Sequence, residues 1–182
     1  IGLVHYRRYF TCKEVYNING KKKAILTGND WLRLVAQYPV VVANKRRYYI
    51  ESNRSHYNHA HHSIGLDETE NIIREIYPEY SQAFAIVCKR TWAHMFNMFV
   101  MRRDLLNEYC EWLFAVLSEL EKRLDISSFD VYQSRVFGFV GERLLDVWLE
   151  TNHICYAEQN ISFMESQNWL KKGSSFLKRM II

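Results

Sequence analysis

A short apolar segment followed by basic and aromatic residues occurs twice in this chain, and this pattern constrains the fold most strongly. Residues 1–6 are largely apolar and lead into residues 7–10, while residues 40–43 are wholly apolar and lead into residues 44–49. Open α/β sheets bind ligands in a crevice outside the carboxyl ends of their strands. The pattern therefore predicts two buried strands, each ending at side chains suited to an anionic ligand.

The rest of the chain alternates helical and strand signals. Apolar residues at spacings of three and four predict a helix over residues 103–124 with one buried face. Further elements are predicted as helices over 30–37 (capped by Asp30), 67–77 and from 132 or 139 to 149, a strand over 94–101, and a polar, histidine-rich loop over 52–66. This alternation is typical of an α/β domain with a mixed sheet.

The composition favours one domain in a reducing compartment. A chain of 182 residues has room for a single core, and its four cysteines lie far apart with no Cys-x-x-Cys pair. We interpret these cysteines as reduced, which favours the cytoplasm. No segment reaches the roughly 20 apolar residues of a membrane span.

The net charge of +4 is divided among short basic clusters with acidic residues between them. Such clusters suit phosphate groups or a membrane surface better than a nucleic-acid duplex. His5, Arg7 and Arg8 form one candidate site, because guanidinium groups match phosphate oxygens two at a time. Lys45 and Arg46 form a second. Surface ion pairs are the alternative interpretation of both clusters.

Residues 56–62 contain four histidines. A zinc site needs three or four His, Cys or carboxylate ligands with fixed geometry. No cysteine lies nearby and the His-Glu-x-x-His pattern is absent, so the segment favours a polar loop in which one histidine joins a site.

Two polar positions in apolar surroundings are further candidates. Asn97 interrupts the predicted strand over 94–101, where it could orient a substrate hydroxyl or satisfy backbone groups. Glu142 and Arg143 follow two glycines at a helix start, where a carboxylate beside an arginine can act as a general base or form a plain ion pair. The glycine spacing matches neither Gly-x-Gly-x-x-Gly nor the phosphate loop ending in Gly-Lys, and no Gly-x-Ser-x-Gly motif occurs.

Several segments, in one order, resemble a bacterial family known as a domain of unknown function in capsular and exopolysaccharide glycosyltransferases. They are Ile1 to Phe10, Val40 to Tyr49, Tyr57 to Tyr80, His94 to Met101, Glu108 to Phe114 and Phe137 to Leu149. The resemblance implies a GT-A-like transferase of nucleotide-diphospho-sugars, with a mixed sheet flanked by helices, and galactosyl transfer is known among family members. It also implies that an N-terminal strand–helix segment, which should hold much of the nucleotide pocket, precedes Ile1 and is missing here.

The resemblance implies a glycosyltransferase domain over residues 1–150, with residues 151–182 as its C-terminal strand and basic amphipathic tail. Two departures from the family matter. Gly65 stands where an acidic residue is expected before Leu66, and the Asp-x-Asp motif, the usual metal and diphosphate site of GT-A enzymes, is absent. No metal ligand is therefore assigned, although a divalent metal is compatible with the family.

The implied reaction moves a hexosyl group, galactosyl being one candidate, to a hydroxyl of a saccharide or lipid-linked saccharide. Preorganised cations would stabilise the leaving diphosphate. The candidate roles are diphosphate binding by His5, Arg7, Arg8, Lys45 and Arg46, general-base catalysis by Glu142, and sugar or acceptor binding by Asn97, His61 and Arg143. We expect no nucleic-acid partner.

Two other functions stay open. The chain could be a non-catalytic fragment or a carbohydrate- or phosphate-binding module of the same fold. A basic RNA-binding domain is a weaker alternative, because it would need aromatic side chains exposed on a sheet face. The tail over 169–182 mixes basic and apolar residues, which suggests peripheral contact with the inner face of the cell membrane.

Overall fold

The computed structural model describes residues 1–12, 17–18, 21–22 and 25–163. A four-stranded sheet lies at its centre, with the order β1 (Gly2–Leu3), β8 (Phe99–Met101), β5 (Val40–Ala43) and β9 (Tyr156–Gln159). β8 runs antiparallel to both of its neighbours, whereas β5 and β9 are parallel. The predicted α/β class with a mixed sheet is confirmed.

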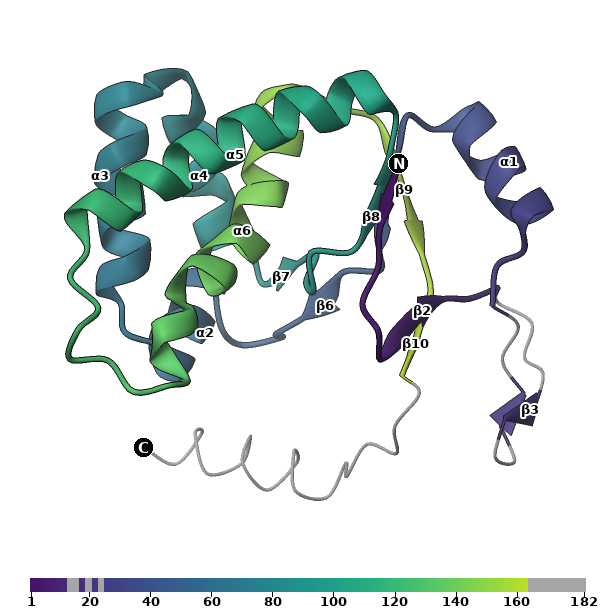
Figure 1. Ribbon diagram of the computed structural model, residues 1–182, viewed down its shortest axis with the longest axis horizontal. Coiled ribbons are helices and arrows are strands. Elements are labelled where there is room, and N and C mark those ends of the chain that lie inside the picture. Colours follow the sequence, from purple (N-terminus) through teal and green to yellow (C-terminus); the bar gives the residue numbers. More distant parts are fainter. Residues whose placement is uncertain (13–16, 19–20, 23–24, 164–182) are drawn as a thin grey trace.

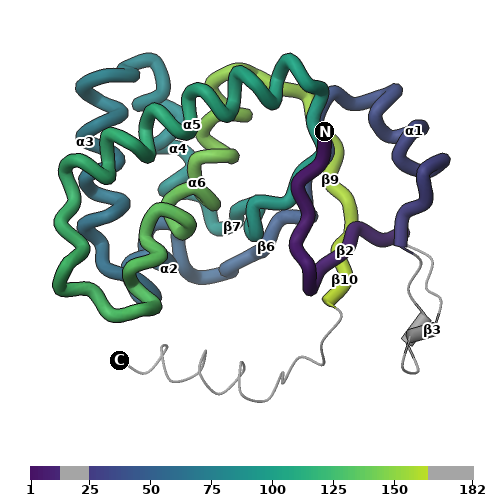
Figure 2. Tube along the Cα trace, in the orientation of Figure 1, coloured from purple at the N-terminus to yellow at the C-terminus, as the bar shows by residue number. Residues whose placement is uncertain are grey.

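Helices flank this sheet on both sides (Figures 1 and 2), as expected. α1 (Gly28–Gln37) packs on β5 from one side. The other side holds the helical layer of α2 (Asn53–Ala60), α3 (Ile64–Ile76), α4 (Ser81–Lys89), α5 (Arg103–Arg123) and α6 (Val136–Thr151). Short 3-10 turns, η1 (Pro78–Tyr80) and η2 (Gln133–Arg135), precede α4 and α6.

The main core lies between the sheet and the helical layer. The residues of β5 are fully buried, which agrees with the predicted buried strand over 40–43. The buried side chains of α5 follow the predicted helical period, and Glu119 pairs with Arg123 one turn away at 2.8 Å on its outer side. α6 is buried along almost its whole length, so it fixes its polar residues firmly relative to the sheet.

Three two-stranded pairs extend from this body. They are β2 (Arg8–Phe10) with β10 (Ile161–Phe163), β6 (Arg46–Arg47) with β7 (Trp92–Ala93), and β3 (Asn17–Ile18) with β4 (Lys21–Lys22). Of these, β2 contains Arg8 and β6 contains Arg46, whereas His5, Arg7 and Lys45 precede the two strands.

The prediction of one buried strand over residues 1–6 is wrong. The chain turns back at Tyr6 and Arg7, where the Arg8 amide donates to the His5 carbonyl at 3.0 Å. β1 lies at the sheet edge and pairs with β8 alone among the described strands, so Leu3 and Val4 stay about half exposed. Arg7 lies in this turn with its side chain exposed, whereas Arg8 begins β2 and is partly buried.

Residues 52–66 form helices rather than the predicted loop. The Ser52 hydroxyl caps α2 by accepting from the Ser55 amide at 3.1 Å, and Tyr57 of the same helix is buried. The caps also correct the start of α1, where Thr27 is the N-cap and Asp30 is its capping-box partner.

The predicted strand over 94–101 is interrupted by a turn. Phe96 and Asn97 have positive φ angles of 81° and 49°, which end the extended backbone between β7 and β8. Among the described helices none is long and apolar enough to cross a membrane. The tail over 164–182, with the membrane contact suggested for it, lies outside the described residues.

Candidate functional site

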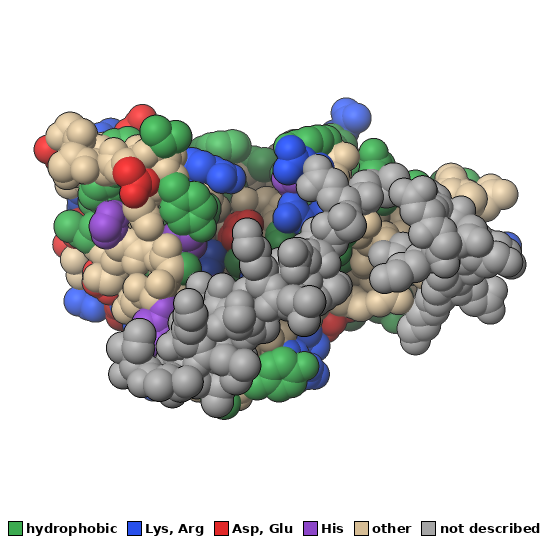
Figure 3. Space-filling view, turned by 90° about the horizontal axis from the view of Figure 1, so that it is seen from below, with side chains coloured by type: hydrophobic (Ala, Val, Ile, Leu, Met, Phe, Trp, Pro, Cys, Tyr) green, Lys and Arg blue, Asp and Glu red, His purple; other side chains and the backbone are tan. Residues whose placement is uncertain are grey.

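Glu142 on α6 is the centre of a polar cluster formed by distant parts of the chain. Burial raises the pKa of Glu142. The charge of the adjacent Arg143, a backbone hydrogen bond from Phe96, and the charges of Arg8 and Arg46 act in the opposite direction and lower this pKa. The fold therefore brings β2, β6 and the turn before β8 to the first half of α6. Figure 3 shows Lys and Arg side chains beside an acidic side chain near the middle of one face.

Arg8 is held between two aromatic rings. Its guanidinium carbon lies 4.1 Å from the ring centre of Phe96 and 5.1 Å from that of Phe163. Stacking of this kind fixes the planar group and leaves its edge for hydrogen bonds. Arg46 is exposed, with its guanidinium carbon 5.6 Å from the ring centre of Tyr48. The charges of the two arginines both act on Glu142.

Arg143, predicted to contact a sugar or acceptor, is buried next to Glu142 on α6. Its side chain is 2% exposed, donates to the Phe139 carbonyl at 2.9 Å and approaches the Glu142 carboxylate at 3.3 Å. The guanidinium also lies over the Tyr57 ring at 5.0 Å. Burial leaves no room for a sugar on this side chain, so its contact is with the carboxylate, whose ionised form it favours.

Asn97 and His61 border the cluster. The Asn97 amide lies next to α6, because a Cβ added to Gly141 would stand 4.0 Å from its nitrogen. His61 follows α2 and stacks on Phe139 with ring centres 3.8 Å apart. Burial, with the nearby Arg143 charge, lowers the pKa of His61 to about 4, so its ring is neutral at physiological pH.

Three predicted diphosphate ligands, His5, Arg7 and Lys45, have contacts with residues other than Glu142. His5 and Arg7 belong to the turn before β2, where the Arg7 amide donates to His5 Nδ1 at 3.2 Å and the exposed Arg7 side chain stacks over Tyr6. Lys45 pairs with Glu158 at 2.7 Å and lies over the Trp92 ring. Its charge is therefore already balanced by a carboxylate of β9.

Comparison with known proteins follows from this geometry. A family model described as a domain of unknown function, DUF4422, matches residues 1–153. This chain belongs to the DUF4422 family. A search of the curated proteins finds no match.

One solved structure resembles the DUF4422 chain closely in fold. The apo structure of the bifunctional glycosyltransferase WbbM superposes with a TM-score of 0.79 at 23% sequence identity. The match covers 91% of this chain and 33% of the WbbM chain, so this chain spans about a third of that protein's length. At this identity the likeness shows a shared fold.

The structure adds site residues of this DUF4422 chain that the sequence did not single out. Tyr48 lies under Arg46, stacks on His56 at 4.1 Å and donates to the Met95 sulfur. Asp146, one helical turn beyond Glu142, accepts from the His94 backbone. In the sequence, the spacing of four between Glu142 and Asp146 indicates that they share a face of a helix. Only the tertiary contact with the 94–97 turn shows what that face packs against.

Gly65 also has a structural explanation in this chain. A Cβ there would come 2.4 Å from a methyl carbon of Val136 and 2.9 Å from the Tyr57 hydroxyl. At Gly65 α3 therefore packs directly against Val136 of α6, and an acidic side chain would not fit.

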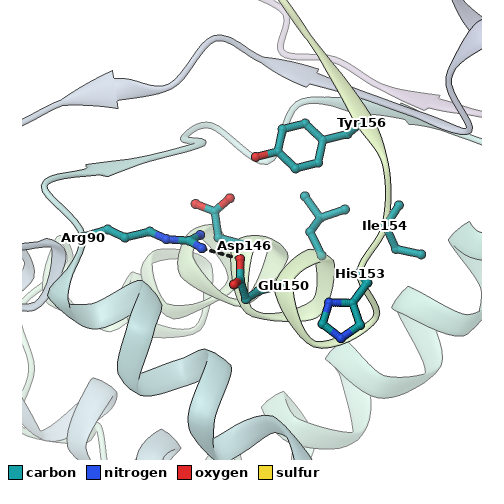
Figure 4. A pocket seen from close by; sticks show the side chains of 7 residues that line it. Arg90, Asp146, Glu150, His153, Ile154 and Tyr156 are labelled. Carbon is teal, nitrogen blue, oxygen red and sulfur yellow. Dashed lines mark hydrogen bonds and ion pairs between the residues drawn. The ribbon is translucent and has the colours of Figure 1, made fainter.

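Two hollows in the described part of the chain are lined by residues other than Glu142. One of about 130 Å³ is lined by Arg90, Asp146, Glu150, His153 and Tyr156 among others (Figure 4), and one of about 370 Å³ lies between α1 and β9. Within the described ranges no three His, Cys, Asp or Glu side chains are arranged to hold a metal ion.

Proposed function

We propose that this chain is a glycosyltransferase domain that moves a hexosyl group from a nucleotide-diphospho-sugar to a saccharide hydroxyl. The observation on which this rests is that the charges of Arg8 on β2 and Arg46 on β6 both act on the buried Glu142 carboxylate of α6. The fold shared with WbbM supports the same class. We further propose that the acceptor is a growing capsular or exopolysaccharide chain, and galactosyl is our first candidate for the donor group.

The arginines would act on the leaving group. As the bond between the anomeric carbon and the diphosphate oxygen breaks, the electron pair stays on the diphosphate, whose negative charge grows. Cations held in place before the reaction stabilise this charge more in the transition state than in the ground state. Arg8 meets that requirement because Phe96 and Phe163 fix its plane.

Glu142 would act on the acceptor. The acceptor oxygen attacks an anomeric carbon with oxocarbenium character, and its proton passes to the Glu142 carboxylate. Burial raises the pKa of Glu142, which brings it closer to neutral pH and makes it a stronger base. Arg143 opposes this shift and keeps the carboxylate ionised before the acceptor arrives.

Asn97 and His61, which border the cluster, would contact the sugar. Asn97 would do so through its side-chain amide, which suits hydroxyl groups. We place the reaction in the cytoplasm, where it would meet lipid-linked acceptors at the inner face of the membrane.

A donor screen tests this proposal. The full gene product containing this chain is incubated with individual nucleotide sugars and saccharide acceptors, and the release of nucleoside diphosphate is measured. Release that depends on the acceptor supports the transferase. Donor binding without release with any acceptor would instead support a binding module of the same fold.

A further inference from the structure

The turn formed by residues 94–97 faces the proposed catalytic cluster with each of its four residues. His94 contacts Asp146, the Met95 sulfur accepts from Tyr48, and Asn97 lies beside Gly141. The Phe96 backbone bonds to Glu142 while its ring stacks on Arg8. This short segment therefore contacts Glu142, Arg8 and Tyr48.

This turn has a backbone that the local sequence does not favour. Phe96 has a φ of 81°, in a region that residues other than glycine rarely adopt, and Asn97 follows with a φ of 49°. Such residues keep their conformation only where surrounding contacts hold it. The turn therefore needs an anchor outside its own sequence.

The anchor is a buried pair on α6. Asp146 accepts from the His94 backbone amide at 2.9 Å through one oxygen and lies 2.5 Å from His94 Nδ1 through the other. Both side chains are at most 2% exposed. Figure 4 shows the Asp146 side chain leaving α6 toward Tyr156, while the neighbouring Glu150 pairs with Arg90.

Asp146 and Glu142 are four residues apart on α6, so both carboxylates face the same turn. Asp146 holds the start of the turn at His94, and Glu142 accepts a hydrogen bond from the Phe96 amide two residues later. The position of that amide relative to Glu142 is thus set by the Asp146–His94 contact.

We propose that Asp146 and His94 are positioning residues, which anchor the 94–97 turn so that the Phe96 amide orients the Glu142 carboxylate and the Phe96 ring holds Arg8. This rests on the proposed function in so far as Glu142 is the base. Neither residue touches a substrate. Their effect is on Glu142 and Arg8, which act on the substrates.

The carboxyl pKa of Glu142, measured by carbon NMR on protein labelled at glutamate, gives a test that needs no substrate. The charged groups that act on Glu142 are Arg143, Arg8 and Arg46. His94 also lies near the Glu158 carboxylate, which forms an ion pair with Lys45. Asp146→Asn removes a negative charge nearby, which by itself lowers the pKa of Glu142. Release of the turn removes the Phe96 hydrogen bond, which raises it.

His94→Gln keeps the Asp146 charge, so in this variant a rise in the Glu142 pKa supports positioning, and a fall or no change overturns it. Asp146→Asn is the second variant, in which a rise against the effect of the lost charge gives further support. Glu150→Gln is the matched control, because Glu150 lies one turn further on α6 and pairs with Arg90 instead.

Kinetics separate this inference from the proposed function. In the full gene product, we expect Asp146→Asn to lower kcat about 10²-fold, since misplacement by about 1 Å has that effect, and to raise the donor KM through the displaced Arg8. An equal rise in KM at constant kcat would overturn it. If no donor supports transfer even in the unmodified protein, the proposed function fails, while the NMR titration still decides the positioning role.

Discussion

Replacing Glu142 by glutamine separates its chemistry from its place in the fold. The two side chains have the same size, and the glutamine oxygen can still accept from the Phe96 amide, so the 94–97 turn should stay in place. What is lost is the ability to take a proton. Removal of a general base lowers rates about 10²–10⁴-fold, which corresponds to about 2.7–5.5 kcal/mol of transition-state stabilisation.

The same substitution has a predicted sign for stability. Because burial raises the pKa of Glu142, its contribution to stability is complete below its ordinary pKa of 4.5 and is lost as the pH rises through the raised value. Glutamine carries no charge and avoids this loss. Glu142→Gln should therefore unfold like the parent at pH 4 and be at least as stable at pH 7.

Acceptor-dependent release of nucleoside diphosphate and urea unfolding at both pH values measure these effects, with Glu150→Gln as the matched control on the same helix. Turnover of Glu142→Gln within tenfold of the parent would refute its role as base. Lower stability at pH 7 than the parent would refute the account of its burial.

Three further predictions follow from other contacts. Gly65→Ala should lower the free energy of unfolding by about 1–3 kcal/mol, because its Cβ would come 2.4 Å from a Val136 methyl, whereas Gly138→Ala, which meets nothing within 4 Å, serves as control in urea titrations. Arg8→Lys should weaken UDP binding about tenfold in calorimetry, since an ammonium loses the planar stacking on Phe96; unchanged affinity would count against a diphosphate role. The low pKa of His61, about 4, means that the unfolded chain binds its proton more readily, so stability should fall by about 1–2 kcal/mol from pH 6.5 to 4, and His61→Phe should remove that dependence.

The elements with a clear period could be predicted from the sequence. The buried face of α5 repeats every three to four residues, and β5 is an uninterrupted apolar run at the sheet centre. β1 has similar apolar residues but lies at an edge, a difference that depends on pairing rather than composition. The turn at Phe96 was missed because an apolar aromatic residue gives no local signal for a positive φ.

The candidate site was predicted only in part. Glu142, Arg8 and Arg46 were selected by residue type and meet in space, whereas Lys45 stands beside Glu158, a partner 113 positions away that no local pattern reveals. The role of Asp146 was not predictable, since its neighbour His94 comes from a different part of the chain. The roles of the site residues themselves stay predictions.

The position of a bound nucleoside diphosphate tests the central claim most directly. A crystal structure of the full gene product with UDP, the leaving group of a UDP-sugar donor, would show where the diphosphate lies. We predict that its oxygens contact the guanidinium groups of Arg8 and Arg46. A diphosphate bound instead at Lys45 and Glu158, or in the hollow beside Arg90, would contradict the assignment of this cluster as the transfer site.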